Sequence, residues 1–165
     1  MTLRSDGVTL TSARDLRSVT PDNLRFADDW VILVGDLKRC TGGDDGDNVL
    51  DIARHFATAL ARYDHLMGLG GDDTLRGGDG CDLLQGCAGR DLLAGGGGAG
   101  MFVFTPGDHG RDVIRDFAAG QDHIDLSGLS DVQVSLHHGA TVITTSDMTL
   151  ILRSVGHPDP GSLFL

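Results

Sequence analysis

The sequence predicts an all-β protein whose centre is a stack of short repeats. Three observations lead to this prediction. Residues 68–103 repeat every nine positions, a large apolar residue recurs in each repeat, and glycine and aspartate recur at fixed positions before it. A fixed period of this kind indicates stacked structural units, because each unit is too small to bury a core alone.

The repeat has four rows, which read GLGGDDTLR, GGDGCDLLQ, GCAGRDLLA and GGGGAGMFV. Glycine occupies the first and the fourth position of every row. Glycine adopts positive φ angles without a steric penalty, so the chain can reverse its direction within six residues. The first-position glycines are Gly68, Gly77, Gly86 and Gly95, and the fourth-position glycines are Gly71, Gly80, Gly89 and Gly98.

The eighth position carries a large apolar side chain in each row. These residues are Leu75, Leu84, Leu93 and Phe102. Stacking the rows would place them in one continuous core, where each burial contributes roughly 1.5–3 kcal/mol. A flexible glycine-rich linker would not keep leucine and aspartate in phase, so we favour a folded repeat.

The sixth position carries Asp73, Asp82 and Asp91, but Gly100 in the last row. Stacked turns would bring these carboxylates together, and the carboxylates would repel one another unless a cation lay between them. Carboxylate and main-chain carbonyl oxygens are hard ligands that suit Ca²⁺. The candidate metal-binding residues are therefore Asp73, Asp82 and Asp91 with the turn residues Gly71, Gly80 and Gly89.

These rows resemble the nonapeptide GGxGxDxUx of the RTX (repeats-in-toxin) proteins, and the row Gly77–Gln85 matches every defined position. The resemblance implies a parallel β-roll in which two nonapeptides form one coil. Turns 18 residues apart then lie on the same side, with Ca²⁺ between them. It therefore implies that Asp73 and Asp91 share a site, whereas Asp82 faces Gly100, which offers no carboxylate.

The repeat extends imperfectly towards the amino terminus. Asp64 and Leu66 keep the phase of the sixth and eighth positions, although Arg62 replaces a glycine, so Asp64 is a further candidate ligand. Residues 42–50 form a damaged repeat in either of two frames. One frame places Asp47 and Val49 in the sixth and eighth positions, and the other places Asn48 and Leu50 there.

The segment after the repeats also resembles a known pattern. Residues 111–127 contain RDVIRDF and GQDHIDLS, which are similar to the DxIxDF…GxDxIDLS segment that follows the repeats in the carboxy-terminal domains of serralysin-type proteases. By position, this resemblance implies that Asp112 and Asp116 are further Ca²⁺ ligands near the last coil. Asp122 and Asp125 follow them as weaker candidates.

We divide the chain into four parts. Ile52, Phe56 and Leu60 recur at helical spacing, which predicts an amphipathic helix that interrupts the repeats. Three alternating segments near the carboxy terminus predict an antiparallel meander that closes the roll: Val132–Leu136, Thr141–Thr145 and Met148–Leu152. The parts are an amino-terminal strand cap with the damaged repeat (1–51), the helical insertion (52–67), the RTX β-roll (68–104), and a carboxy-terminal β cap with a secretion signal (105–165).

The composition favours a cation as the partner. The chain has 165 residues and a net charge of −11, and all 24 acidic residues are aspartate. Such a charge argues against nucleic acid and anionic membranes as partners. No stretch approaches the roughly 18 apolar residues that a membrane span needs.

The catalytic motifs of RTX enzymes are missing from the sequence. An HExxH motif is impossible without glutamate, and no GxSxG motif occurs. We therefore predict a non-catalytic chain, and a lone enzyme is only a third hypothesis. The three cysteines, Cys40, Cys81 and Cys87, cannot all pair within one chain, and we interpret them as small residues that fill repeat positions.

The resemblance also implies export. Similar RTX proteins leave Gram-negative cells through a type I ABC transporter, guided by an uncleaved carboxy-terminal signal. The apolar tail Ser162–Leu165 looks like such a signal, which implies a secreted, extracellular protein. The leading hypothesis is thus a secreted module that folds on binding Ca²⁺ outside the cell.

The alternative hypothesis is an accessory module that binds an anionic polysaccharide. The R-modules of alginate epimerases use a similar roll with a basic face. Four arginines could form such a face here: Arg76, Arg90, Arg111 and Arg115.

Overall fold

The computed structural model describes residues 2–5, 8–11, 32–34, 46–52 and 63–153. The regular elements of these residues are fourteen strands, which confirms the predicted all-β class. The described residues contain no helix of the length and hydrophobicity needed to cross a membrane. Strands β1 (Thr2–Ser5) and β2 (Val8–Thr11) pair with each other as an antiparallel hairpin.

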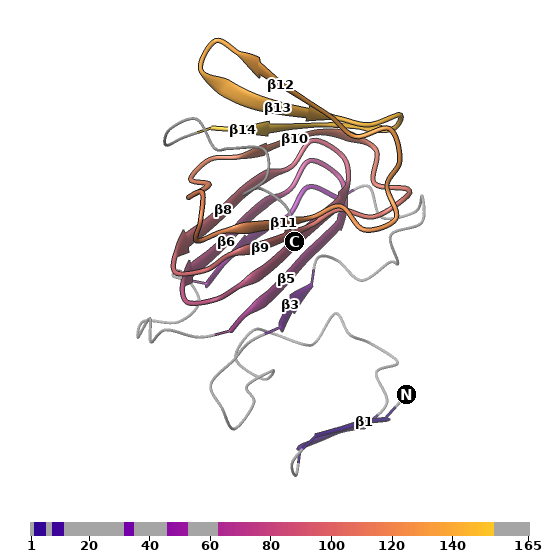
Figure 1. Cartoon of the computed structure of the whole chain (residues 1–165). Helices are drawn as coiled ribbons and strands as arrows, with labels where there is room; N and C mark the ends of the chain where they lie inside the picture. Colours follow the sequence, from indigo (N-terminus) through magenta and orange to yellow (C-terminus); the bar gives the residue numbers. More distant parts are fainter. Residues whose placement is uncertain (1, 6–7, 12–31, 35–45, 53–62, 154–165) are drawn as a thin grey trace.

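Two sheets form the body of the molecule, and from β3 to β12 the chain alternates between them from one strand to the next (Figure 1). Within each sheet the successive strands of the repeats pair in parallel, as the prediction of a parallel β-roll requires. The five-stranded sheet contains β3 (Ile32–Val34), β5 (His65–Gly70), β7 (Leu83–Ala88), β9 (Met101–Val103) and β11 (His123–Asp125). The seven-stranded sheet contains β4 (Val49–Asp51), β6 (Thr74–Asp79), β8 (Leu92–Gly97), β10 (Gly110–Ile114), β14 (Met148–Leu152), β13 (Ala140–Thr144) and β12 (Gln133–His137).

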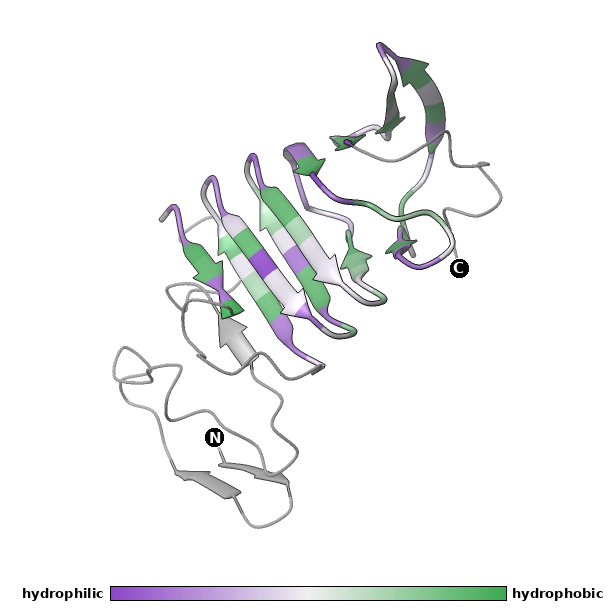
Figure 2. Cartoon of the chain, turned by 90° about the vertical axis from the view of Figure 1, so that its left-hand side faces the viewer, coloured by the Kyte–Doolittle hydropathy of each residue, from purple (hydrophilic) through white to green (hydrophobic). Residues whose placement is uncertain are grey.

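The eighth-position residues form the predicted apolar spine. Leu75 pairs in register with Leu93, and Leu84 pairs with Phe102, so side chains of the same repeat position lie one above another. All four side chains are fully buried. Because side chains alternate between the two faces of a strand, the seventh-position residues point away from this core. Figure 2 shows the stacked strands side by side, with hydrophobic residues along them.

The roll begins earlier in the chain than we predicted. β3 pairs in parallel with β5, and β4 pairs in parallel with β6, so these parts of residues 1–51 are strands of the roll itself. The register places Leu50 opposite Leu75, and Leu50 packs against the core, whereas Val49 is 58% exposed. The frame with Asn48 and Leu50 in the key positions is therefore correct.

The predicted helix over residues 52–67 is wrong at its carboxy-terminal end. His65, Leu66 and Met67 belong to β5, and Leu66 is fully buried opposite Leu84. The nine-residue repeat, and not the helical spacing, therefore determines the secondary structure here, because Leu66 fills the next position of the spine. Residues 53–62, which include the predicted helix centre, lie outside the described part of the chain.

The carboxy-terminal meander is confirmed, with a different attachment. β12, β13 and β14 pair antiparallel in order, but β14 also pairs in parallel with β10. The meander therefore caps the roll by continuing the seven-stranded sheet beyond β10, the last strand of the stacked coils in that sheet. Ser162–Leu165 and Cys40 lie outside the described residues, Cys81 is an exposed free thiol, and Cys87 is buried.

Truncating the spine should destabilise the protein strongly. We expect Leu84→Ala to lower the free energy of unfolding by about 2–5 kcal/mol, because it leaves a cavity between two coils. Val49→Ala, at an exposed position of β4, should change it by less than about 0.5 kcal/mol. Urea unfolding of both variants in calcium-containing buffer measures this difference, and equal effects would contradict the proposed spine.

Candidate metal-binding site

The sixth-position residues align along two edges of the roll, each immediately before a strand. We name these rows the first and the second Asp edge. Parallel pairing of β4, β6, β8 and β10 forms the first Asp edge, which consists of Asn48, Asp73, Asp91 and Asp112. Parallel pairing of β5, β7, β9 and β11 forms the second Asp edge, which consists of Asp64, Asp82, Gly100 and Asp122.

Hydrogen bonds join neighbouring coils along the first Asp edge. The main-chain N–H of Asn48 donates to Asp73 Oδ1 at 2.7 Å, and the N–H of Asp73 donates to Asp91 Oδ1 at 2.9 Å. The N–H of Asp91 then donates to Asp112 Oδ1 at 2.9 Å. The structure thus brings Asp73 and Asp91 together, and it adds Asp112 to the same row.

The second Asp edge repeats this arrangement, except that one of its rows has no carboxylate. The N–H of Asp64 donates to Asp82 Oδ1 at 3.0 Å. Gly100 has no carboxylate, but its N–H donates to Asp122 Oδ1 at 2.8 Å, and the N–H of Ala118 donates to Asp122 Oδ2 at 2.8 Å. Gly100 thus leaves the fourth row without a carboxylate, and Asp122 supplies one in the next coil.

The sequence offers Asp122 only as a weaker candidate, and in the structure it follows its partner Gly100 by 22 residues and not by the 18 of the repeat. A signal was nevertheless present. Asp122 precedes Ile124 by two positions, as each sixth-position aspartate precedes its spine leucine, and Ile124 is buried opposite Phe102. Asp112 and Ile114 show the same pattern.

The other candidates are placed differently. Asp116 accepts hydrogen bonds from the N–H groups of Gly95 and Gly96 at 3.0 and 2.9 Å, so it binds the second half of β8 and lies outside both Asp edges. Asp125 accepts a hydrogen bond from the N–H of Ser127 at 2.8 Å, and hydrogen bonds from the side chain and the N–H of Ser127 lower its pKa. Asp125 is part of β11 and lies outside both Asp edges.

The second carboxylate oxygens point into the turns. Asp82 Oδ2 and Asp91 Oδ2 are buried and have no hydrogen-bond partner within the described structure. A Cβ atom on Gly77 would collide with Asp82 Oδ2, and a Cβ atom on Gly86 would collide with Asp91 Oδ2. The first-position glycine is thus required because the aspartate of the same row occupies the space of its side chain.

The turns of successive coils contact each other through the main chain. The N–H of Gly71 donates to the carbonyl of Ala88 at 3.1 Å, and the N–H of Gly80 donates to the carbonyl of Gly97 at 2.6 Å. Gly89 has a φ of 142°, and a Cβ atom there would collide with the carbonyl oxygen of Gly71. The fourth-position glycines therefore let main-chain carbonyls approach closely beside the carboxylates.

At the second position of the repeat, two residues other than glycine adopt a strained backbone conformation. Leu69 has a φ of 83° and Cys87 a φ of 72°, in the region that side chains with a Cβ atom rarely adopt. Both are buried and face each other in register between β5 and β7. Packing between the stacked turns holds them in this conformation.

The buried aspartates retain protons unusually strongly. The pKa of Asp91 is raised to about 7, mainly by burial and to a smaller extent by the negative charges of Asp112 and Asp73. Burial likewise raises the pKa of Asp112 to about 7 and that of Asp82 to about 6. Hydrogen bonds from the neighbouring main chain oppose these shifts without cancelling them.

This donor set fits a hard cation. Carboxylate and carbonyl oxygens are the ligands of Ca²⁺, and two buried carboxylate oxygens, Asp82 Oδ2 and Asp91 Oδ2, lack a hydrogen-bond partner among the described residues. Among the described residues, no three His, Cys, Asp or Glu side chains converge on one point. A cation at either Asp edge would therefore draw on main-chain carbonyls of the glycine turns as well as on aspartates.

The raised pKa values predict an inverted pH dependence for protein stripped of divalent metal. Asp82, Asp91 and Asp112 bind protons more tightly when folded than in the unfolded chain, where the pKa is about 3.9. The free energy of unfolding should therefore fall as the pH rises from about 4 to about 7. Urea unfolding at a series of pH values measures this slope.

The matched control for this experiment is the double variant Asp91→Asn with Asp112→Asn, in which the slope should be smaller because two titrating groups are absent. A metal-free stability that is constant or increases between these pH values would contradict the structure of the Asp edges.

Comparison with known proteins agrees with this architecture. The family described as Peptidase M10 serralysin C terminal matches residues 42–153. One similar solved structure is the AlgE6R3 subunit of the mannuronan C5-epimerase from Azotobacter vinelandii, with 31% sequence identity and a TM-score of 0.50. The match covers 70% of this chain and 75% of that one. No curated protein matches the chain. The chain belongs to the family of serralysin carboxy-terminal domains.

Proposed function

We propose that this chain is a non-catalytic Ca²⁺-binding module that folds when it meets calcium outside the cell. The observation that carries the proposal is the pair of buried oxygens, Asp82 Oδ2 and Asp91 Oδ2, which have no hydrogen-bond partner within the described structure. They lie in stacked turns whose carboxylates are surrounded by further carboxylates and main-chain carbonyls. A divalent cation is the partner that satisfies such oxygens and neutralises their charge.

The Asp edges supply the ligands in this proposal. On the first Asp edge the carboxylates are Asp73, Asp91 and Asp112, and on the second they are Asp64, Asp82 and Asp122. Carbonyls of the turns around Gly71, Gly80 and Gly89 complete the oxygen set. Asp116 accepts hydrogen bonds from Gly95 and Gly96 of β8, and in this way it contributes to calcium binding indirectly.

The energetics make folding conditional on the metal. Without a cation at neutral pH, the carboxyl groups of Asp82 and Asp91 are either protonated or buried as charges, and a buried charge costs stability. Calcium at about 100 times its dissociation constant adds about 2.7 kcal/mol per site, which is a large part of the stability of a small domain. Extracellular modules bind Ca²⁺ with dissociation constants of about 10⁻⁴–10⁻³ M, so such a module would fold after export.

The family relationship supports the export step. We assign the chain to the secreted proteins that leave through a type I ABC transporter, as the resemblance of its repeats implies. An unfolded, metal-free chain inside the cell suits passage through a narrow transporter.

A second candidate function is binding of an anionic polysaccharide. It is supported by the similarity to a subunit of a mannuronan C5-epimerase. Of the four arginines in the predicted basic face, Arg90, Arg111 and Arg115 are exposed. Arg76 instead forms an ion pair with Asp51 at 3.1 Å, so it contributes less to such a face.

Calcium should convert the metal-free chain from disordered to β-rich. We expect circular dichroism at pH 7.5 to show little regular structure in a chelator and a β spectrum at millimolar Ca²⁺. A spectrum that does not respond to calcium would refute the proposed function.

Removing one ligand should shift this transition. We expect Asp91→Asn to raise the calcium concentration at the midpoint by about tenfold, because affinity follows the charge count of the ligands. Asp147→Asn, which removes an exposed charge in the turn between β13 and β14, should leave the midpoint unchanged. Calorimetric titration gives the number of ions bound, and an equal shift in both variants would show that net charge alone sets the affinity.

Polysaccharide binding should depend on the exposed arginines. We expect the calcium-loaded protein to bind alginate in calorimetry at low salt, and the triple variant of Arg90, Arg111 and Arg115 to glutamine to bind at least about tenfold more weakly. Dextran, an uncharged polysaccharide, is the control. If alginate gives no binding at low salt, this second function is excluded.

A further inference from the structure

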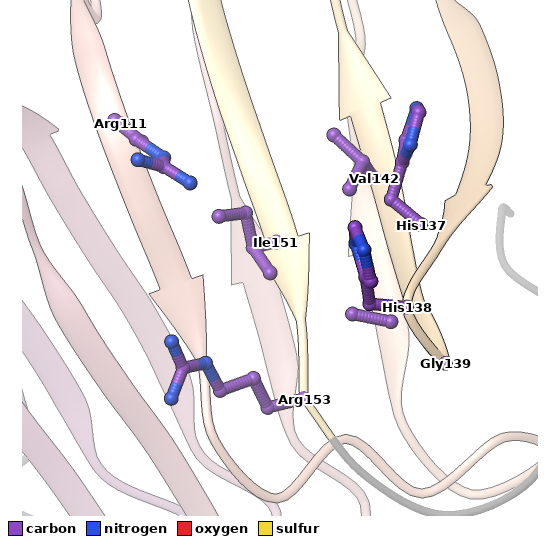
Figure 3. Close-up of a pocket in the computed structure, with 8 residues that line it drawn as sticks. Arg111, His137, His138, Gly139, Val142, Ile151 and Arg153 are labelled. Carbon is purple, nitrogen blue, oxygen red and sulfur yellow. The ribbon is translucent and has the colours of Figure 1, made fainter.

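A groove of about 500 Å³ lies beside the carboxy-terminal hairpin, and no residue of either Asp edge lines it (Figure 3). Arg111 and Arg153 lie on one side of it, and His137 and His138 lie on the other. Ile151 lies between these two groups. The groove therefore combines residues from four neighbouring strands of the seven-stranded sheet and from the turns at their ends.

The register of the sheet explains why these residues meet. Val142 of β13 is paired with Ile151 of β14, and Ile151 is paired with Val113 of β10. Their sequence neighbours on β13 and β14 belong to the core, so Val142 and Ile151 project from the opposite, outer face of the sheet. This outer face provides the floor of the groove.

The hairpin turn places the histidines. His138 and Gly139 have φ angles of 50° and 82°, which corresponds to the two-residue type I′ turn favoured between antiparallel strands. The turn ends β12 at His137, which is paired with Ala140 across the hairpin. Both imidazoles are exposed beside the groove in consequence.

The charge of the groove is opposite to that of the chain. Two arginines and two histidines line it, and none of the described lining residues is acidic, although the chain has a net charge of −11. A guanidinium group remains charged at all physiological pH values and can donate two parallel hydrogen bonds to a carboxylate, phosphate or sulfate. An imidazole adds a further donor.

The floor of the groove is apolar. Ala140, Val142 and Ile151 offer methyl groups between the charged sides. Binding sites for small molecules commonly join such an apolar surface to a few placed polar groups that fix the orientation of the ligand. A bare inorganic ion would use only the sides of this groove and leave the floor uncovered.

We propose that this groove binds a small organic oxyanion, in which a carboxylate, sulfate ester or phosphate ester is attached to an apolar or ring-shaped body. Arg111 and Arg153 hold the charged group, His137 and His138 donate from the facing side, and the body of the ligand covers Val142 and Ile151. This site is separate from the calcium sites, and it requires only that the sheet is folded.

The test is nuclear magnetic resonance of the full chain in saturating Ca²⁺, with three ring compounds as probes. Benzoate and phenyl sulfate carry the two kinds of anion, and benzyl alcohol is the uncharged analogue. We expect saturable shifts of the signals of Ala140, Val142 and Ile151 with the anions and none with the alcohol. A response to only one anion would support the site and identify its preferred group. The absence of any saturable shift, or equal shifts with benzyl alcohol, would overturn the proposal.

Variants test the assigned roles. Arg111→Gln with Arg153→Gln should weaken binding of the responding anion at least about tenfold, since each removes a charge-assisted hydrogen bond. The lysine variants at the same two positions keep the charge and should lose less. Circular dichroism in Ca²⁺ checks that each variant folds. Unchanged affinity in the glutamine variant would overturn the assignment.

The histidines have a matched control elsewhere in the chain. His137→Gln with His138→Gln should weaken binding severalfold, whereas His109→Gln with His123→Gln, which lie outside the groove, should not. If both pairs weaken binding equally, the anions are attracted only by the general charge of the protein, and the groove is not a specific site.

Discussion

The structure depends on one hydrogen bond that is repeated from coil to coil, in which a main-chain N–H donates to an aspartate carboxylate of the next coil. It joins Asp73 to Asp91 and Asp91 to Asp112 on one edge, and Asp64 to Asp82 on the other. The bond fixes the vertical register of the turns, and the register in turn places each spine residue above the last. It also buries a carboxylate in most rows, which is a costly position for a charge. The stacking of the turns and the burial of the aspartates are thus two results of the same contact.

Glycine makes this contact possible at two levels. Within a row, the glycine at the first position leaves space for the carboxylate that ends the turn, as the clash of a Cβ atom at Gly86 with Asp91 Oδ2 shows. Between rows, the glycine at the fourth position lets carbonyls approach the next coil. The fixed spacing of glycine and aspartate in the repeat therefore follows from the steric requirements of the stacked turns. At pH values near 7 these buried carboxylates are partly protonated, because burial contributes most to raising the pKa of Asp91 and of Asp112 to about 7.

The sequence was sufficient to predict the roll, its apolar spine and most of the two Asp edges, because each rests on a strictly periodic pattern. The predictions were wrong where the nine-residue spacing becomes irregular or where a second pattern overlaps it. Leu66 lies in a strand although its neighbours show helical spacing, and Asp122 completes an edge although its distance from Gly100 is irregular. The groove at Arg111 and Arg153 was not predicted, because only the parallel pairing of β10 with β14 brings these residues together. That pairing joins segments far apart in the sequence and leaves no local pattern.

The spacing between bonded partners along the two edges is uneven, with 25, 18 and 21 residues on the first and 18 and 22 on the second. The same hydrogen bond nevertheless recurs along both edges, so the additional residues do not disturb the pairing between coils. Loop closure costs only about 0.6 kcal/mol for each doubling of loop length. The scaffold should therefore accept foreign peptides between coils, which would make it a metal-controlled display frame whose grafted loops are presented only after calcium has assembled the strands beneath them.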